Sequence, residues 1–106
     1  MLHELPVISI PIKDKIYNLL VASTEEEKNK GLSGVQHLED NEGMLFVYDD
    51  DKPRQFQFKD TCLPLEVYFI RNDGKVIQNS TSSPYQSDPI SCDLPCRWVI
   101  EVLSKD

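Results

Sequence analysis

Several short segments of this chain alternate apolar with polar residues, and turn-forming residues separate them. The alternation is clearest in residues 65–70 and 98–102, where every second side chain is apolar and would lie on one face of a strand. Residues 44–48 form a continuous apolar run after Gly43, as expected for a strand that is buried on both faces. A chain built mainly of such segments forms sheets rather than a helical bundle, so the pattern favours a mainly β fold.

Three other segments are also expected to be strands. Residues 15–22 have the composition of a strand, whereas residues 5–12 are expected to form an edge strand or an irregular lead-in, because Pro11 lacks a backbone N–H. Residues 72–74 read Asn-Asp-Gly, which is typical of a tight hairpin turn. Residues 75–78 would then form the returning strand of this hairpin.

One short helix is expected after these first strands. Thr24 can accept a hydrogen bond from the backbone N–H of Glu27, and the Glu27 carboxylate can accept one in return, which is the capping-box pattern. Acidic residues in the first turn and lysines in the last turn suit the helix dipole. Gly31 is expected to end the helix in a left-handed conformation.

Two segments are expected to lack regular structure. A polar loop is expected around Pro53, and residues 79–95, rich in Ser, Asp and Pro, would form the longest irregular stretch. The chain has 106 residues, the size of one domain, and contains no internal repeat. The expected fold is a compact, single-domain β-sandwich or barrel-like structure over residues 1–106, mainly β with one short helix.

The formal net charge of −7 narrows the range of partners. Residues 25–51 hold nine acids and two bases, which accounts for the whole excess. Nucleic acid and anionic membranes bind clustered Lys and Arg, so neither is an expected partner. No apolar run approaches the ~20 residues of a membrane span. The first fifteen residues lack the pattern of a signal peptide, so we expect a soluble, cytoplasmic protein.

Motif blocks spread along the chain resemble a known family, the domain of unknown function 192. In chain order the blocks are Gly31-Leu32, residues 43–47, residues 56–61, Pro64-Leu65-Glu66, Phe69-Ile70, Asp73-Gly74 and residues 97–102. The resemblance implies a compact, mainly β fold. It implies no reaction, because the family is uncharacterised.

The chain departs from the family pattern where that pattern is richest. The family block F-W-M-K-N-T corresponds here to Phe-Gln-Phe-Lys-Asp-Thr, so Gln57 stands for the Trp and Asp60 for the Asn. Glu66 stands where the family usually has Asp, whereas Lys59 and Thr61 are kept. If the Trp and Asn line a ligand site in relatives, this chain binds a different ligand or has lost the site.

The candidate ligand-binding residues are Gln57, Lys59, Asp60, Thr61 and Glu66. If the flanking phenylalanines point into the core, Gln57 and Lys59 share the opposite face, and Asp60 and Thr61 lie in the turn that follows. A purely structural role is the competing interpretation. Thr and Asp at strand ends commonly bond backbone groups, and Lys59 with Glu66 would be a weak surface pair.

Three functions are compatible with these candidate ligand-binding residues. The first is a non-catalytic β domain that binds a small ligand or a protein partner through Gln57, Lys59, Asp60 and Glu66. The second is an enzyme of unknown reaction type that uses Lys59 with Asp60 or Glu66, which requires a buried, deprotonated lysine. The third is an accessory role in a larger assembly, for which an exposed apolar patch would be the sign.

The three cysteines are Cys62, Cys92 and Cys96. Three residues separate Cys92 from Cys96, which is not the C-x-x-C spacing of redox and zinc motifs. The two are interpreted as either a small disulfide or a pair of buried thiols, and the expected location favours thiols. A nucleophilic Cys62 would need a neighbouring base, which no motif supplies. No cofactor motif or metal-ligand spacing occurs, so neither a cofactor nor a metal is expected.

Overall fold

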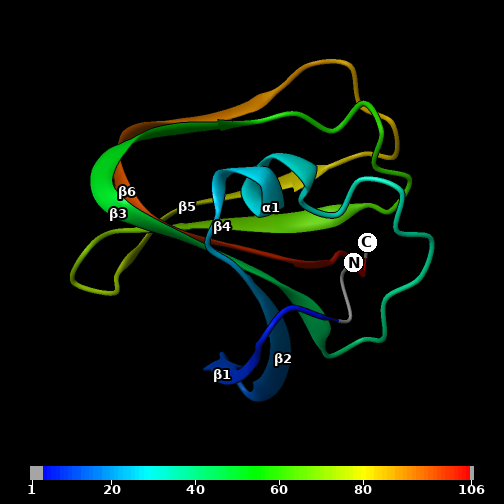
Figure 1. Ribbon diagram of the computed structural model, residues 1–106, viewed down its shortest axis with the longest axis horizontal. Helices are drawn as coiled ribbons and strands as arrows, with labels where there is room; N and C mark the ends of the chain where they lie inside the picture. The colour runs from blue at the N-terminus through cyan, green and yellow to red at the C-terminus, as the bar shows by residue number, and fades with distance from the viewer. Residues whose placement is uncertain (1–3, 106) are drawn as a thin grey trace.

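Six strands form a single mixed sheet in the computed structural model, which describes residues 4–105 (Figure 1). The strands are β1 (Val7–Ile12), β2 (Lys15–Ala22), β3 (Glu42–Phe56), β4 (Leu65–Ile70), β5 (Val76–Ser82) and β6 (Ile90–Leu103). Their order across the sheet is β1-β2-β3-β6-β4-β5, and all neighbours are antiparallel except β2 and β3. The prediction of a mainly β fold with one short helix is confirmed, and these strands lie in one curved sheet.

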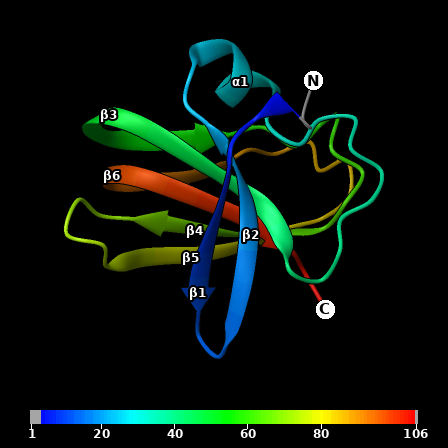
Figure 2. The ribbon, with the colours of Figure 1, turned by 60° about the horizontal axis from the view of Figure 1, so that its bottom comes forward.

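Helix α1 (Glu25–Lys30) lies in the crossover that the parallel pair β2–β3 requires (Figure 2). The predicted capping box is present, because Thr24 Oγ1 accepts from the Glu27 N–H and the Glu27 carboxylate accepts from the Thr24 N–H, both at 3.1 Å. Gly31 ends the helix with a positive φ of 51°, although its ψ of −129° lies outside the left-handed helical region. No helix in the described part of the chain is long and apolar enough to cross a membrane.

Strand β3 continues through the loop that was expected around Pro53, so that prediction is wrong. Its pairing with β6 shifts register between Val47 and Lys52 and again between Lys52 and Arg54. Such shifts bend a strand pair without ending it. Pro53 lies at the second shift, where its missing N–H interrupts no regular pairing. Figure 1 shows β3 and β6 turning back together at this point.

Arg54 holds the bend together. Its Nη2 donates to the carbonyl oxygen of Asp50 at 2.6 Å and to the Asp50 carboxylate at 2.7 Å. Nη2 and Nε also donate to the carbonyl oxygen of Cys96 on β6, at 2.9 and 3.1 Å. The side chain is only 10% exposed, so these charge-assisted bonds are shielded from water.

The irregular segment predicted over residues 79–95 is much shorter in the structure. Residues 79–82 extend β5 and pair with β4, and residues 90–95 already belong to β6. Backbone pairing does not require apolar side chains, and the Ser82 hydroxyl also accepts from the Leu65 N–H at 3.2 Å. Only residues 83–89 therefore lack a strand assignment, and the predicted extent is wrong.

The sheet buries apolar side chains on both faces. The face toward α1 carries, among others, Met44, Phe46, Phe56, Leu65, Val67, Phe69 and Val99. The opposite face carries Leu19, Leu45, Tyr68, Ile100 and Val102. The predicted alternation in residues 65–70 and 98–102 is confirmed, and so is the two-sided burial of residues 44–46.

Gly43 allows β3 and β6 to approach closely, which yields a test of this packing. A Cβ atom at Gly43 would lie 2.2 Å from the carbonyl oxygen of Glu101 and 2.8 Å from Cγ1 of Val102. We expect Gly43→Ala to lower the free energy of unfolding by about 2–3 kcal/mol, because two central strands must move apart. Chemical denaturation measures this change.

The control for this experiment is Gly34→Ala. Gly34 has a φ of 79° and open space where its Cβ would lie. Alanine there is expected to lower stability by about 1 kcal/mol through backbone strain alone. Equal losses for the two variants would contradict the steric explanation for Gly43.

Candidate functional site

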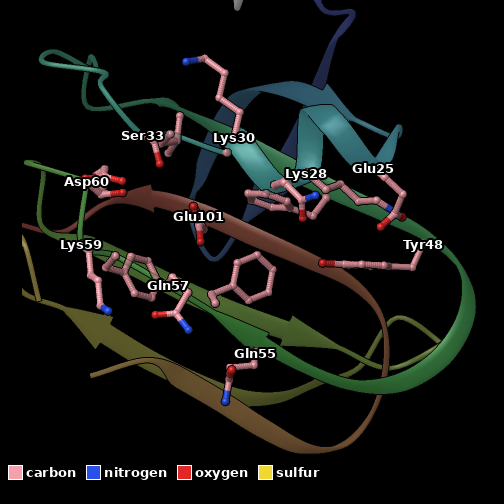
Figure 3. Close-up of a pocket in the computed structure, with 17 residues that line it drawn as sticks. Glu25, Lys28, Lys30, Ser33, Tyr48, Gln55, Gln57, Lys59, Asp60 and Glu101 are labelled. Atoms are coloured by element: carbon pink, nitrogen blue, oxygen red, sulfur yellow. The ribbon is translucent and has the colours of Figure 1, made fainter. Parts of the chain in front are cut away.

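A cavity of about 430 Å³ lies between α1 and the part of β3 that follows the bend (Figure 3). This volume is within the range of small-molecule sites, ~300–1,000 Å³. The walls include Phe46, Phe56 and Phe58, which are 1%, 9% and 2% exposed. The bend creates the cavity, because it brings Phe56 and the residues after it opposite the helix.

Glu101 projects from β6 into this cavity (Figure 3). Its neighbours across the sheet are Met44 on β3 and Val67 on β4, so the carboxyl group lies on an apolar floor. The residue is 3% exposed, and its carboxyl group forms no hydrogen bond or ion pair with the described residues. Burial raises the pKa of Glu101 to about 8. The group is therefore mostly protonated at neutral pH and can both donate and accept a hydrogen bond.

Thr61 is the second buried polar residue at the cavity and is 4% exposed. Its backbone N–H donates to the carbonyl oxygen of Phe58 at 3.2 Å, and its own carbonyl oxygen accepts from the Tyr85 N–H at 2.9 Å. Its hydroxyl has no hydrogen-bond partner among the residues that the structure describes. No fully buried side-chain oxygen or nitrogen of the described residues lacks a hydrogen-bond partner, so the unbonded oxygens of Glu101 and Thr61 are open to the cavity, where a water or a ligand can bond them.

Three lysines line the cavity, and they differ in their partners. The Lys28 ammonium group donates to the carbonyl oxygen of Val47 at 3.0 Å and lies 3.3 Å from the Glu25 carboxylate. Lys30 and Lys59 are exposed, and their ammonium groups form no ion pair or hydrogen bond within residues 4–105. Only these last two are therefore free to bind an anion.

Four of the five predicted ligand-binding residues line this cavity, namely Gln57, Lys59, Asp60 and Thr61. Glu66 lies on the other face of the sheet, where its carboxylate accepts a hydrogen bond from the Tyr68 hydroxyl at 2.7 Å. The structure therefore does not bring Lys59 and Glu66 together. A role of Gln57, Lys59, Asp60 and Thr61 in binding a ligand at this cavity stays a prediction.

Cys92 and Cys96 are buried free thiols on β6, and their sulfur atoms lie 3.5 Å apart. Cys96 pairs with Lys52 and Cys92 with Arg54, so one residue of β3 stands opposite the three residues 93–95 of β6, which bulge from the ladder. Burial raises the pKa of Cys96 to about 12, and the neighbouring Cys92 thiol adds to this shift. The two sulfur atoms are not bonded to each other in the structure, and the choice between a thiol pair and a disulfide stays a prediction.

Glu101 is not among the residues predicted from the sequence, although a signal for it exists. It is the one charged residue in the apolar segment 98–103. A strand position that alternates with apolar residues on both sides is a poor place for an acid unless a partner or a functional site requires it. Its place in a cavity could not be inferred, because that depends on the bend of β3.

The fold and the cavity define a class of small β domain, in which a bent sheet and a short helix enclose an open pocket with a buried carboxyl group. The model of the DUF192 family, described as Uncharacterized ACR, matches residues 8–105. The chain belongs to this family, as the motif blocks implied.

Two solved structures are similar to this chain. A proposed transcription regulator from Sinorhizobium meliloti is 25% identical, with a TM-score of 0.80 over 92% of this chain and 78% of that chain. A protein of unknown function from Novosphingobium aromaticivorans is 24% identical, with a TM-score of 0.82 over 95% of this chain and 74% of that chain. A comparison with proteins of curated function found no match.

The buried carboxyl group predicts an unusual pH dependence of stability. Between its ordinary pKa of 4.5 and its folded pKa of about 8, Glu101 binds a proton in the native state but not in the unfolded state. Wild-type stability should therefore fall as the pH rises through this window, by up to about 1.4 kcal/mol per pH unit. We expect Glu101→Gln to remove this contribution, measured by urea denaturation at several pH values between 5 and 8.

Glu66→Gln is the matched control for this measurement, because it removes an acid from the opposite face of the sheet. The stability of Glu66→Gln should fall with rising pH as steeply as that of the wild type. If the stability of Glu101→Gln falls with rising pH as steeply as that of the wild type, the Glu101 carboxyl group is not the source of the pH dependence.

The thiol pair predicts slow alkylation. Because burial holds the pKa of Cys96 near 12, little thiolate is present at pH 8. We expect iodoacetamide to label Cys92 and Cys96 at least about 100-fold more slowly in the native protein than in urea, as followed by peptide mass spectrometry. Cys62 is only partly buried and provides an internal reference. Labelling of Cys96 at the rate of Cys62 would contradict the burial argument.

Proposed function

We propose that this chain is a non-catalytic binding domain whose cavity takes up a small polar ligand. The observation that supports this is the pair of buried groups, the Glu101 carboxyl and the Thr61 hydroxyl, that line the cavity without a partner among the described residues. A ligand that bonds both would use two hydrogen-bonding groups that open onto the cavity and that no described residue occupies. Gln57, Lys59 and Asp60 would contact the same ligand from the mouth of the cavity.

The alternative, an enzyme that uses Lys59 with Asp60 or Glu66, has less support. A lysine base or nucleophile needs burial, whereas Lys59 is exposed. Glu66 lies on the opposite face of the sheet. Glu101 does have a pKa suited to proton transfer, and finding its ligand is the step that would identify a substrate.

Direct binding to nucleic acid is not part of the proposal. One structural neighbour is described as a proposed transcription regulator, but the formal charge of this chain is −7. Binding to a phosphate backbone needs clustered Lys and Arg. A small ligand, or a protein partner that presents a small polar group, fits the cavity better.

The test is a fragment screen by two-dimensional NMR, with amines, carboxylates, alcohols and amides as separate pools. Hits should shift the backbone amides of Ser33, Gln57, Thr61 and Glu101. Thr61→Val removes the buried hydroxyl with little change in shape. Because one hydrogen bond is lost, the hits should bind this variant about 3- to 10-fold more weakly.

Thr81→Val is the matched control, because Thr81 is exposed on β5. It should bind every hit like the wild type. The proposal is refuted if no compound shifts the cavity amides, or if hits map only to the opposite face of the sheet.

A further inference from the structure

The floor of the cavity suits a positively charged group. Glu101 is the only buried acid among the described residues, and it shares the cavity with the aromatic side chains of Phe46, Phe56 and Phe58. No cation of the protein pairs with it within residues 4–105. Aromatic rings beside a carboxylate are surroundings in which proteins hold organic ammonium groups.

The mouth of the cavity suits a negatively charged group. In Figure 3, Lys59 and Asp60 lie on one side of Glu101, Tyr48 and Glu25 lie on the other, and the Lys30 side chain points away from the cavity. Lys28 is bound to Glu25, as described above, whereas the ammonium groups of Lys30 and Lys59 have no partner among the described residues. An anion reaching the end of the cavity beside Lys59 would meet one uncommitted cation.

We infer that the cavity recognises a compact zwitterion, with a primary ammonium group at Glu101 and a carboxylate at Lys59. The inference rests on the proposed function and adds the charge and the orientation of the ligand. The apolar body between the two charged ends would contact the phenylalanine side chains. A ligand with an ammonium group alone would leave the Lys59 ammonium group without a partner, so both charges are needed for the tightest binding.

Binding of such a ligand must release a proton. Before binding, Glu101 is mostly protonated at neutral pH. Its carboxyl group ionises when it pairs with the ligand ammonium group, and the proton leaves to solvent. The other charged or titratable groups at the cavity are Glu25, Lys28 and Lys30 from α1, Tyr48 from β3, and Lys59 and Asp60 beyond the end of β3.

The opposite orientation has the opposite pH dependence. A ligand carboxylate could share the proton of Glu101 only while that group is protonated, so its affinity would be nearly constant well below pH 8 and would fall as the pH rises through 8. The affinity of the inferred zwitterion would instead rise by up to about tenfold per pH unit below pH 8.

Three matched probes test the inference by isothermal titration calorimetry. They are 4-(aminomethyl)benzoate, which carries both charges, benzylamine, which lacks the carboxylate, and 4-methylbenzoate, which lacks the ammonium group. We expect the zwitterion to bind at least about tenfold more tightly than either single-charge probe, since each lost contact is a charge-assisted hydrogen bond. Titrations at pH 7 in two buffers of different ionisation enthalpy should show the release of nearly one proton per zwitterion.

Variants assign each charge to its end of the cavity. Glu101→Gln keeps the shape of the side chain, but the glutamine amide cannot ionise. This variant should therefore release no proton on binding and should bind the zwitterion about tenfold more weakly. Lys59→Ala changes an exposed residue. It should lower the affinity for the zwitterion and leave the affinity for benzylamine unchanged. Glu66→Gln is the control and should bind all three probes like the wild type.

The inference fails if 4-methylbenzoate binds as tightly as the zwitterion, if affinity falls with rising pH, or if binding releases no proton. It also fails if the zwitterion does not bind while other fragments shift the cavity amides. In that case the proposed binding function stands and only the ligand class is wrong. If neither the three probes nor any fragment binds, both the inference and the proposed function fail.

Discussion

The bent antiparallel pair of β3 and β6 is the constraint on which the rest of the structure depends. The pair forms the centre of the sheet, with β2 on one side and β4 on the other. Its bend, held by the bonds of Arg54 to Asp50 and Cys96, turns the end of β3 toward α1. Without the bend, Phe56 and the residues after it would extend away from the helix, and no cavity would cover Glu101.

Glu101 makes the interior of this bend polar, at a cost to stability. An ionised carboxylate without a partner is strongly disfavoured in an apolar interior, so the group stays protonated at neutral pH. An apolar side chain at this position would pack on Met44 and Val67 without that penalty. Residues that lower stability in this way, in a cavity and without a structural partner, are typical of functional sites.

Local patterns predicted local structure well. The capping box at Thr24, the end of the helix at Gly31 and the alternation in residues 65–70 each depend on neighbouring residues alone, and each is confirmed. The bend at Pro53 could not be predicted, because it depends on β6, a partner some forty residues away. The face of Glu66 followed from the alternation, but its separation from Lys59 followed only from the three-dimensional path of the chain.

The distribution of charge, rather than its sum, decides which ligand can enter the cavity. The acidic excess of residues 25–51 is largely occupied by local structure, since Glu25 pairs with Lys28, and Asp50 and Asp51 pair with arginines. Glu27 accepts hydrogen bonds from the helix N-terminus, which lowers its pKa. These acids are therefore partly compensated before a ligand arrives. With Glu101 protonated, three lysines and two carboxylates, Glu25 and Asp60, line the cavity, so an acidic protein presents no acidic excess at the entrance to a site whose floor is an acid.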